Sequence, residues 1–293
     1  MSSGPSLAAL PAFWLNGVSQ DAAGPHLSAG DRGFLLADGV FETMHAHGGR
    51  IFRLDSHLAR LTRGLAILNI PVPPDLRDWV MDAVQSAGRS KVSVRLSISR
   101  GAGPGGLLPP ENLRPTALVS VTPFPVFPPA TYTSGLTAHI ASGRRNERSM
   151  TNGLKVLAYT DAIVALLEAQ RAGAQEALFL DSESHCSEAT ASNLFAWAGG
   201  TLVTPPGSCG ALPGVTRAAV LEIARTLAIP SATRILTLGE LLAADEAFLT
   251  SSLRGVAPLV AVGKQLIGRG VPGELTARIS EAYAELVARE CGT

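Results

Sequence analysis

The chain has 293 residues, of which 46% are hydrophobic and 16% are charged, and its formal net charge at pH 7 is zero. Such a composition is typical of a folded globular protein long enough for two domains, and it argues against disorder. The charge balance lacks the basic footprint of a nucleic-acid binder, and no apolar run has the length of a membrane span. We therefore expect neither a nucleic-acid nor a membrane partner.

The N-terminus and the cysteines predict the compartment. Residues 1–11 lack the basic start and the apolar core of a secretory signal. Cys186, Cys209 and Cys291 show neither a disulfide framework nor a metal-binding spacing. Free thiols in a reducing compartment are the simplest interpretation, so we expect a cytoplasmic protein.

The first half of the chain mixes strand and helix patterns. We expect strands at 13–17, 50–54, 91–99 and 116–121, and helices at 57–68 and 76–87. Asp55 is the expected N-cap of the first helix. The segment 31–44 alternates poorly and receives no assignment. Four prolines between Pro123 and Pro129 exclude a helix or a central strand, so we place a domain linker at 123–130.

The second half mixes the same two patterns. Strands are expected at 136–141, 176–180, 194–198, 202–204 and 246–250. Helices are expected at 155–171, 218–228, 240–242 and 274–289, with Lys155 in the opening of the first. The sequence thus predicts a mixed α/β (α+β) protein with domains at 1–122 and 131–293.

Lys155 is the most informative residue of the chain. Only three of the 24 basic side chains are lysines, namely Lys91, Lys155 and Lys264. An amine can lose its proton when it is desolvated and then attack a carbonyl, whereas a guanidinium effectively never deprotonates. Because Lys155 lies at the mouth of an apolar segment, it is a candidate Schiff-base residue, and pyridoxal phosphate (PLP) is its natural partner.

Three other features fit such a cofactor. Gly214 and Thr216 lie where a helix begins, and the N–H groups of a helix N-terminus bind phosphate; an ordinary turn explains them equally. Glu188 precedes a run of small polar residues and can pair with a pyridine nitrogen; it can also be a solvated loop residue. Arg53 can clamp a phosphate, although surface arginines on strands are common.

In this order the segments resemble the fold type IV PLP enzymes, also known as the class IV aminotransferase family. That group includes branched-chain aminotransferases, D-amino acid aminotransferases and aminodeoxychorismate lyases. The resemblance covers Trp14 to Gly263, and its most specific segments are 31–43, 53–61, 154–159, 176–195 and 212–217. It implies a small N-terminal α/β domain and a larger C-terminal pseudo-barrel domain with the cofactor between them, and usually a homodimer.

The resemblance also assigns roles to residues. Lys155 would be the catalytic lysine that forms an imine with PLP, and Glu188 would pair with the pyridine nitrogen. Tyr159 would lie near the 3′ oxygen of the cofactor. Further cofactor-binding residues would be Arg53, Ser192, Asn193, Gly214, Val215, Thr216, Ser251 and Ser252.

The choice of reaction depends on finer features. Residues 99–101, 145–149 and 250–258 look more like the lyase branch, and the loop at 104–107 lacks the arginine and histidine common in D-amino acid enzymes. Ala37, Glu42 and Ala158 depart from patterns frequent in the family. Our first choice is 4-amino-4-deoxychorismate lyase, which eliminates pyruvate to give 4-aminobenzoate for folate synthesis. The alternative is a branched-chain or D-amino acid aminotransferase.

Either substrate needs a group that binds carboxylates. Arg95 is one candidate because its neighbours Val94 and Leu96 would face the opposite side of a strand, although a cross-strand ion pair explains it equally. The other substrate-binding candidates are Phe41, His45 and Leu253. His45 and His47 flank Ala46, but they have no third ligand nearby in the sequence, so we expect no metal.

Overall fold

The computed structural model describes residues 11–21, 24–88 and 91–292, and backbone contacts divide the chain into two compact units. Unit 1 comprises Met1–Pro125, Leu154–Ala158 and Val287–Thr293, and unit 2 comprises Val126–Gly153 and Tyr159–Leu286. The change from one unit to the other at 125–126 lies inside the expected linker. The two later segments of unit 1 were not expected, so the division at 1–122 and 131–293 stays a proposal.

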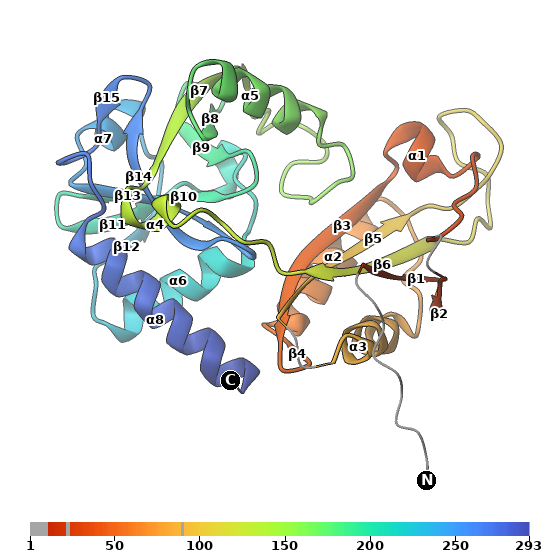
Figure 1. Ribbon diagram of the computed structural model, residues 1–293. Helices are drawn as coiled ribbons and strands as arrows, with labels where there is room; N and C mark the ends of the chain where they lie inside the picture. The colour runs from red at the N-terminus through yellow and green to blue at the C-terminus, as the bar shows by residue number, and fades with distance from the viewer. Residues whose placement is uncertain (1–10, 22–23, 89–90, 293) are drawn as a thin grey trace, which may run out of the picture. The chain divides into compact units, whose positions relative to one another are not determined.

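Unit 1 is built on an antiparallel six-stranded sheet in the order β2-β1-β6-β5-β3-β4 (Figure 1). Its strands are β1 (Ala12–Leu15), β2 (Val18–Ser19), β3 (Gly39–His47), β4 (Arg50–Ile51), β5 (Val92–Ser99) and β6 (Thr116–Pro123). Its helices are α1 (Arg32–Leu36), α2 (Leu54–Ile67) and α3 (Leu76–Ser86). Met44, Leu65 and Val80 belong to the core between one face of this sheet and the helices α2 and α3.

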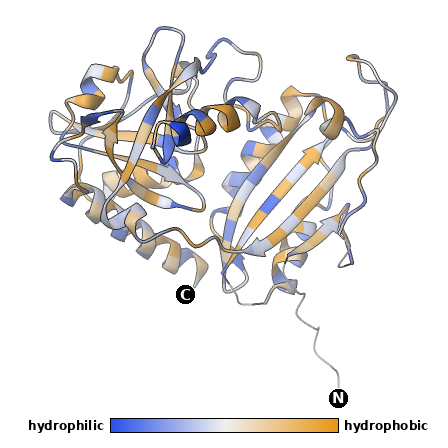
Figure 2. Cartoon of the chain, turned by 45° about the horizontal axis from the view of Figure 1, so that its top comes forward, coloured by the Kyte–Doolittle hydropathy of each residue, from blue (hydrophilic) through white to orange (hydrophobic). Residues whose placement is uncertain are grey.

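The second face of this sheet carries polar side chains. Successive side chains of a strand point to opposite faces. Since Met44 and Leu96 face the core, Phe41, His45 and Arg95 lie on the other face. Along these strands hydrophilic positions stand next to hydrophobic ones (Figure 2). One face of the sheet therefore stabilises the fold, and the other is available for chemistry.

Unit 2 contains a sheet that closes on itself. Its strands are β7 (Leu136–Arg144), β8 (Glu176–Leu180), β9 (Cys186–Ala189), β10 (Asn193–Ala198), β11 (Thr201–Thr204), β12 (Ser231–Thr233), β13 (Glu246–Ser251), β14 (Gly255–Val262) and β15 (Gln265–Leu266). The pairing runs β12-β11-β10-β13-β14-β7-β8-β9, and β9 also pairs with β10. The ring from β10 to β9 is thus closed, as the larger pseudo-barrel domain requires.

Helices cover this closed sheet (Figure 1). They are α4 (Ala130–Thr133), α5 (Thr160–Arg171), α6 (Val215–Thr226), α7 (Leu238–Leu242) and α8 (Glu274–Cys291), and a 3₁₀ turn, η1, spans Gly207–Cys209. Leu178, Leu194 and Leu249 form part of the buried core. Among the described residues, no helix is both long enough and apolar enough to cross a membrane.

The structure corrects four expectations. Of the strand predicted at 50–54 only Arg50–Ile51 is a strand, because α2 begins at Leu54. The predicted helix at 155–171 begins only at Thr160, so Lys155 lies outside it. Asp55 is not the N-cap of α2, because that helix already begins at Leu54 with Arg53 as its cap. The strand β3 begins inside the segment 31–44, to which we assigned no structure, and ends after it. Nearly all of its side chains are buried, so the alternation of apolar and polar residues that predicts a strand is absent.

Candidate active site

Lys155 lies in an extended segment that pairs with the start of β3. The Phe41 N–H donates to the Lys155 carbonyl at 2.9 Å, and the Leu157 N–H donates to the Gly39 carbonyl at 3.0 Å. Gly39 is needed here because a Cβ atom would lie 2.2 Å from the Ile98 carbonyl oxygen. Main-chain hydrogen bonds to a central strand therefore fix the position of the lysine.

The Lys155 amine shares an aromatic ring with Arg95. The Nζ atom lies 4.5 Å from the centre of the Phe41 ring, and the Arg95 Cζ atom lies 3.7 Å from the same centre. Arg95 also donates from Nε to Ser97 Oγ at 3.2 Å. Three residues expected from the sequence are thus brought together on the polar face of unit 1, where they offer an amine, a guanidinium and a flat apolar surface.

A buried ion pair lies behind them, on the core side of β3. Glu42 is fully buried, and Arg60 donates to its two oxygens from Nε and Nη2 at 2.7 and 2.6 Å. His57 Nδ1 lies 2.7 Å from the Glu42 carboxylate. Burial by itself raises the pKa of Glu42, but hydrogen bonds from His57 and Arg60 outweigh it and hold the pKa below its usual value. This network fixes β3 to α2 and was not found in the sequence.

His45 carries no charge at neutral pH. Its ring is 4% exposed and stacks on Phe52 with 5.3 Å between the ring centres. Burial lowers the pKa of His45 to about 3, with smaller contributions from His47 and Lys91. Neither ring nitrogen has a hydrogen-bond partner among the described residues. Of the sequence candidates His45 and Arg95, Arg95 is therefore the one that offers a positive charge to a carboxylate.

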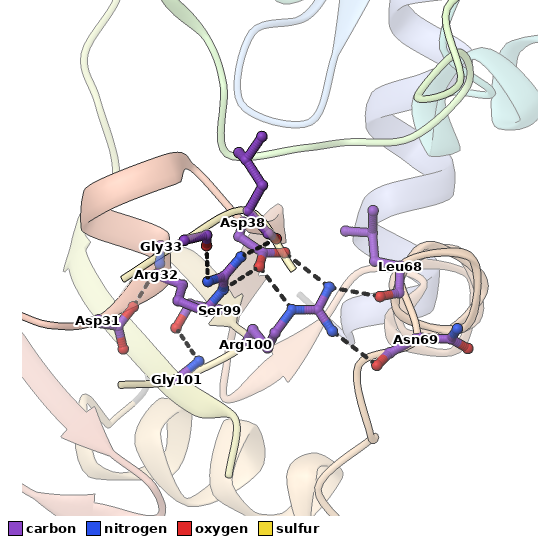
Figure 3. A network of polar contacts seen from close by, with 11 residues as sticks. Asp31, Arg32, Gly33, Asp38, Leu68, Asn69, Ser99, Arg100 and Gly101 are labelled. Carbon is purple, nitrogen blue, oxygen red and sulfur yellow. Dashed lines mark hydrogen bonds and ion pairs between the residues drawn. The ribbon is translucent and has the colours of Figure 1, made fainter. Parts of the chain in front are cut away.

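A second network holds the loop that follows β5 (Figure 3). The Asp38 carboxylate accepts from Arg32 Nε at 2.8 Å and from Arg100 Nε at 2.7 Å. Burial raises the pKa of Asp38, but the two guanidinium groups outweigh it and leave the pKa lowered. Arg32 also donates to the carbonyls of Gly106 and Leu107. The loop at 101–107 is thus attached to the turn that precedes β3.

In unit 2, the Glu188 carboxylate is held from three sides. It lies on β9 with 8% exposure, so it is not a solvated loop residue. Its Oε2 atom accepts from the Leu212 N–H at 2.8 Å and from Asn193 Nδ2 at 3.2 Å. Its Oε1 atom lies 3.2 Å from Arg145 Nη2. Such donors hold the carboxylate in a fixed orientation.

The start of α6 lies next to this carboxylate. Gly214 is the N-cap of α6 and provides no side chain, so the first N–H groups of the helix receive no side-chain cap. A Cβ atom on Gly214 would lie 1.9 Å from Asn193 Oδ1, which explains why glycine is needed. Val215 and Thr216 are buried in the first turn. This helix N-terminus has the geometry that binds a phosphate group.

The remaining candidates of unit 2 surround Asn193. In the sheet, Asn193 lies opposite Glu188 on one side and opposite Thr250 on the other. Ser192 precedes it and is 5% exposed. Ser251 ends β13 and is followed by a turn that contains Ser252 and Leu253. Hydroxyl, amide and carboxylate groups thus lie on neighbouring strands and turns of the closed sheet.

Tyr159 and Arg53 both lie at helix starts. Tyr159 is the residue before α5. Arg53 caps α2 with a left-handed backbone, at a φ of 52°, and does not lie on a strand. Its Nη2 atom lies 3.1 Å from Glu290 Oε1. The structure therefore gives Arg53, which we expected to bind phosphate, a carboxylate partner in unit 1.

The candidates are distributed over both units, and each unit holds a coherent part. Those of unit 1 are Phe41, His45, Arg53, Arg95 and Lys155. Those of unit 2 are Tyr159, Glu188, Ser192, Asn193, Gly214, Val215, Thr216, Ser251, Ser252 and Leu253. Unit 1 contains the amine, and unit 2 contains the buried carboxylate and the helix N-terminus; these are the kinds of group that bind a phosphorylated pyridine aldehyde.

The fold and these donors define a two-unit α/β protein of the kind that binds such a cofactor, and comparison with known proteins gives its family. The family model of class IV aminotransferases matches residues 39–262. The chain belongs to this family, whose enzymes depend on PLP.

Relatives with different reactions are equally similar. A Methanocaldococcus jannaschii protein that bears the name branched-chain-amino-acid aminotransferase is 31% identical to this chain, over 94% of this chain and 96% of its own length. The aminodeoxychorismate lyase of Vibrio harveyi is also 31% identical, over 91% and 97%. Among solved structures, the branched-chain amino acid aminotransferase of Escherichia coli has a TM-score of 0.91 at 26% identity, over 96% of this chain and 95% of that chain.

Proposed function

We propose that the protein is a PLP-dependent enzyme in which Lys155 holds the cofactor and moves the proton of the substrate. PLP, when bound, supplies an aldehyde that condenses with amines and a ring that accepts electrons. The substrate amine would displace the Lys155 Nζ atom from the cofactor, and the freed Nζ atom would then take the proton from the substrate carbon next to the amine. The observation that supports this role is the position of that amine, because hydrogen bonds to β3 fix its backbone and Phe41 lies beneath it.

The other residues would bind and orient the cofactor. The Glu188 carboxylate would keep the pyridine nitrogen protonated, since three donors already hold the carboxylate in place. The N-terminus of α6, with the Thr216 hydroxyl, would bind the phosphate. Arg53 would add a positive charge there by exchanging its contact with Glu290 for one with the phosphate.

For the reaction, we give first place to transfer of an amino group between an amino acid and a 2-keto acid. An α-amino acid carries its carboxylate one bond away from the carbon that loses a proton. Arg95 and Lys155 lie over one and the same ring, so a carboxylate on the guanidinium would bring that carbon toward the amine. In the transfer, Lys155 would return the proton to the cofactor carbon.

Elimination of pyruvate from 4-amino-4-deoxychorismate is the second candidate. It was our first choice from the sequence, on account of residues 99–101, 145–149 and 250–258. The lyase of Vibrio harveyi is as similar to this chain as the aminotransferase-like relative. Because this substrate also carries carboxylates, the arrangement of Phe41 and Arg95 suits it as well.

We further propose a homodimer that works in the cytoplasm. The helix α5 exposes four large apolar side chains, namely Ile163, Val164, Leu166 and Leu167. Apolar groups gathered on one exposed element are typical of a surface that another chain covers. A second copy is the partner that the family resemblance implies, and the molar mass in solution measures it directly.

One experiment separates the two reactions. The PLP-loaded protein is incubated in turn with leucine, glutamate, D-alanine and aminodeoxychorismate, and products are identified together with the visible spectrum. An aminotransferase converts the cofactor to its amine form with an amino acid alone and releases a keto acid. A lyase releases pyruvate and 4-aminobenzoate from aminodeoxychorismate. If neither set of products forms while the cofactor is bound, the proposed reactions are wrong.

A further inference from the structure

Three side chains of different chemistry meet at the end of β8. Asp181 follows β8, His185 precedes β9, and Cys209 ends the turn η1. Each offers one ligand atom, a carboxylate oxygen, an imidazole nitrogen or a sulfur, and all three atoms lie within 4.8 Å of one another. Asp181 and Cys209 are 3% and 2% exposed, and His185 is half-buried.

The backbone holds the carboxylate in a fixed orientation. Asp181 Oδ1 accepts the N–H groups of Glu183 and His185 at 3.0 and 2.8 Å, which closes the turn between β8 and β9. Asp181 Oδ2 lies 3.2 Å from His185 Nδ1, and the Cys209 sulfur lies within 4.8 Å of the ligand atoms that the other two residues offer. One oxygen therefore belongs to the turn and the other to the cluster. Hydrogen bonds of this kind orient the carboxylate ligands of metal sites.

We propose that Asp181, His185 and Cys209 bind one Zn²⁺ ion or a cation of similar softness. Sulfur and imidazole are ligands that zinc prefers, whereas Mg²⁺ and Ca²⁺ prefer oxygen. Tetrahedral zinc with bonds of about 2.0–2.3 Å keeps its ligand atoms roughly 3.3–3.8 Å apart. From separations of up to 4.8 Å, the three atoms need to approach by at most about 1.5 Å to reach that spacing.

The charges of this site balance. A carboxylate and a thiolate together carry two negative charges, which the cation neutralises, so the buried site has no net charge. The metal–sulfur bond replaces the S–H bond of Cys209, and the released proton goes to solvent. His185 is the least buried member of the group, so a water molecule on its side would complete the fourth position.

The cation would connect two segments that lead to the candidate active site. The strand β9, which follows His185, carries Glu188. The turn η1, which ends at Cys209, leads to Leu212, whose N–H binds the same Glu188 carboxylate. Zinc at this position would cross-link the segments around the carboxylate without taking part in the reaction. The presence of this site does not depend on which reaction the protein catalyses.

Titration of the metal-free full-length protein with Co²⁺ tests this site. The thiolate–cobalt absorption and the visible bands of tetrahedral cobalt report the ligands directly, and no activity is needed. We expect saturation at one Co²⁺ per chain, displacement by Zn²⁺, and loss of the spectrum in Cys209→Ser and His185→Gln. Cys291→Ser is the matched control, because it removes another buried cysteine, in unit 1, and should keep the spectrum.

The outcome is decided on the wild type and on three variants. Absence of stoichiometric Co²⁺ binding by the folded wild type would overturn the proposal. So would a thiolate–cobalt absorption that persists in Cys209→Ser or disappears in Cys291→Ser. If Cys209→Ser fails to fold, the half-buried His185→Gln gives the answer, since circular dichroism can verify its fold before titration. A fully retained cobalt spectrum in that variant would equally refute the site.

Discussion

Replacing one member of the Glu42–Arg60 pair is expected to lower the free energy of unfolding by more than the loss of apolar contacts at that residue would. Arg60→Met leaves the Glu42 carboxylate, which is fully buried, without its bidentate partner. Breaking a buried pair on one side costs about 3–5 kcal/mol. Glu42→Leu combined with Arg60→Met removes both charges, so the double variant should recover about 2–3 kcal/mol relative to the sum of the single changes.

Urea unfolding of the four proteins of this cycle measures the coupling. Trp14 and Trp79 lie in unit 1, and Trp197 lies in unit 2, so a Trp197→Phe background makes tryptophan fluorescence a probe of unit 1. We expect the free energies of unfolding to be strongly non-additive. Additivity within about 0.5 kcal/mol would refute the argument that the two charges stabilise each other.

The same cycle predicts a dependence on pH. The pKa of Glu42 is lower in the folded protein than its ordinary value of 4.5. A carboxyl of this kind stabilises the fold above its unfolded pKa and loses that contribution as the pH falls through the folded value. The coupling should therefore be complete at pH 7 and should decline below about pH 4.5. A coupling that grows on acidification would contradict this sign.

Three further changes test other parts of the molecule. Glu188→Gln should slow turnover severely while PLP stays bound, and a normal steady-state rate would reject its role at the pyridine nitrogen. Gly214→Ala should weaken PLP binding by about tenfold or more, because a Cβ atom 1.9 Å from Asn193 Oδ1 forces the Asn193 side chain to move. An equilibrium titration that gives an unchanged dissociation constant for PLP would contradict this prediction. His45→Phe should flatten the loss of stability between pH 6.5 and about 3, because burial keeps the folded ring neutral while the unfolded ring takes up a proton. Thermal unfolding across this range measures the effect. The effect reaches about 5 kcal/mol at most, since a tenfold change in proton affinity is worth about 1.4 kcal/mol. An equally steep profile in the variant would exclude His45 as the cause.

The sequence predicts those elements whose two faces differ. The strand β5 was expected at 91–99, because apolar residues from Val92 to Ile98 alternate with polar ones, and its bounds are Val92–Ser99. The same alternation placed Arg95 on the face opposite Val94 and Leu96, and the structure confirms that position. The helix expected at 76–87 is confirmed as α3 for the same physical reason.

Two strands buried on both sides, β3 and β9, were not predicted, although the equally buried β8 was. Glu188 lies on the fully buried strand β9, which contains small and polar residues and therefore resembles a loop in sequence. Lys155 was assigned to a helix because the apolar residues around it continue into α5. Instead, Gly153, with a φ of 75°, precedes an extended segment that contains Lys155. The pairing of this segment with β3 fixes its position. That pairing joins segments more than 100 residues apart, and local periodicity contains no information on it.

Clusters formed by distant residues were equally invisible. The pair of Glu42 and Arg60 combines a strand and a helix that the sequence did not connect. The group of Asp181, His185 and Cys209 follows no metal-binding spacing, because its third member comes from a separate turn. The roles of the candidate cofactor residues remain proposals from the family resemblance, supported by the contacts that each unit contains.

The most direct test of the account is the chemical identity of the residue that carries the cofactor. Reduction of the PLP-loaded protein with borohydride makes the cofactor–amine bond permanent, and peptide mass spectrometry then locates it. We expect one cofactor per chain, on the peptide that contains Lys155, and none in Lys155→Arg, which should also be inactive. A modification found on Lys91 or Lys264, or full activity of Lys155→Arg, would contradict the central claim.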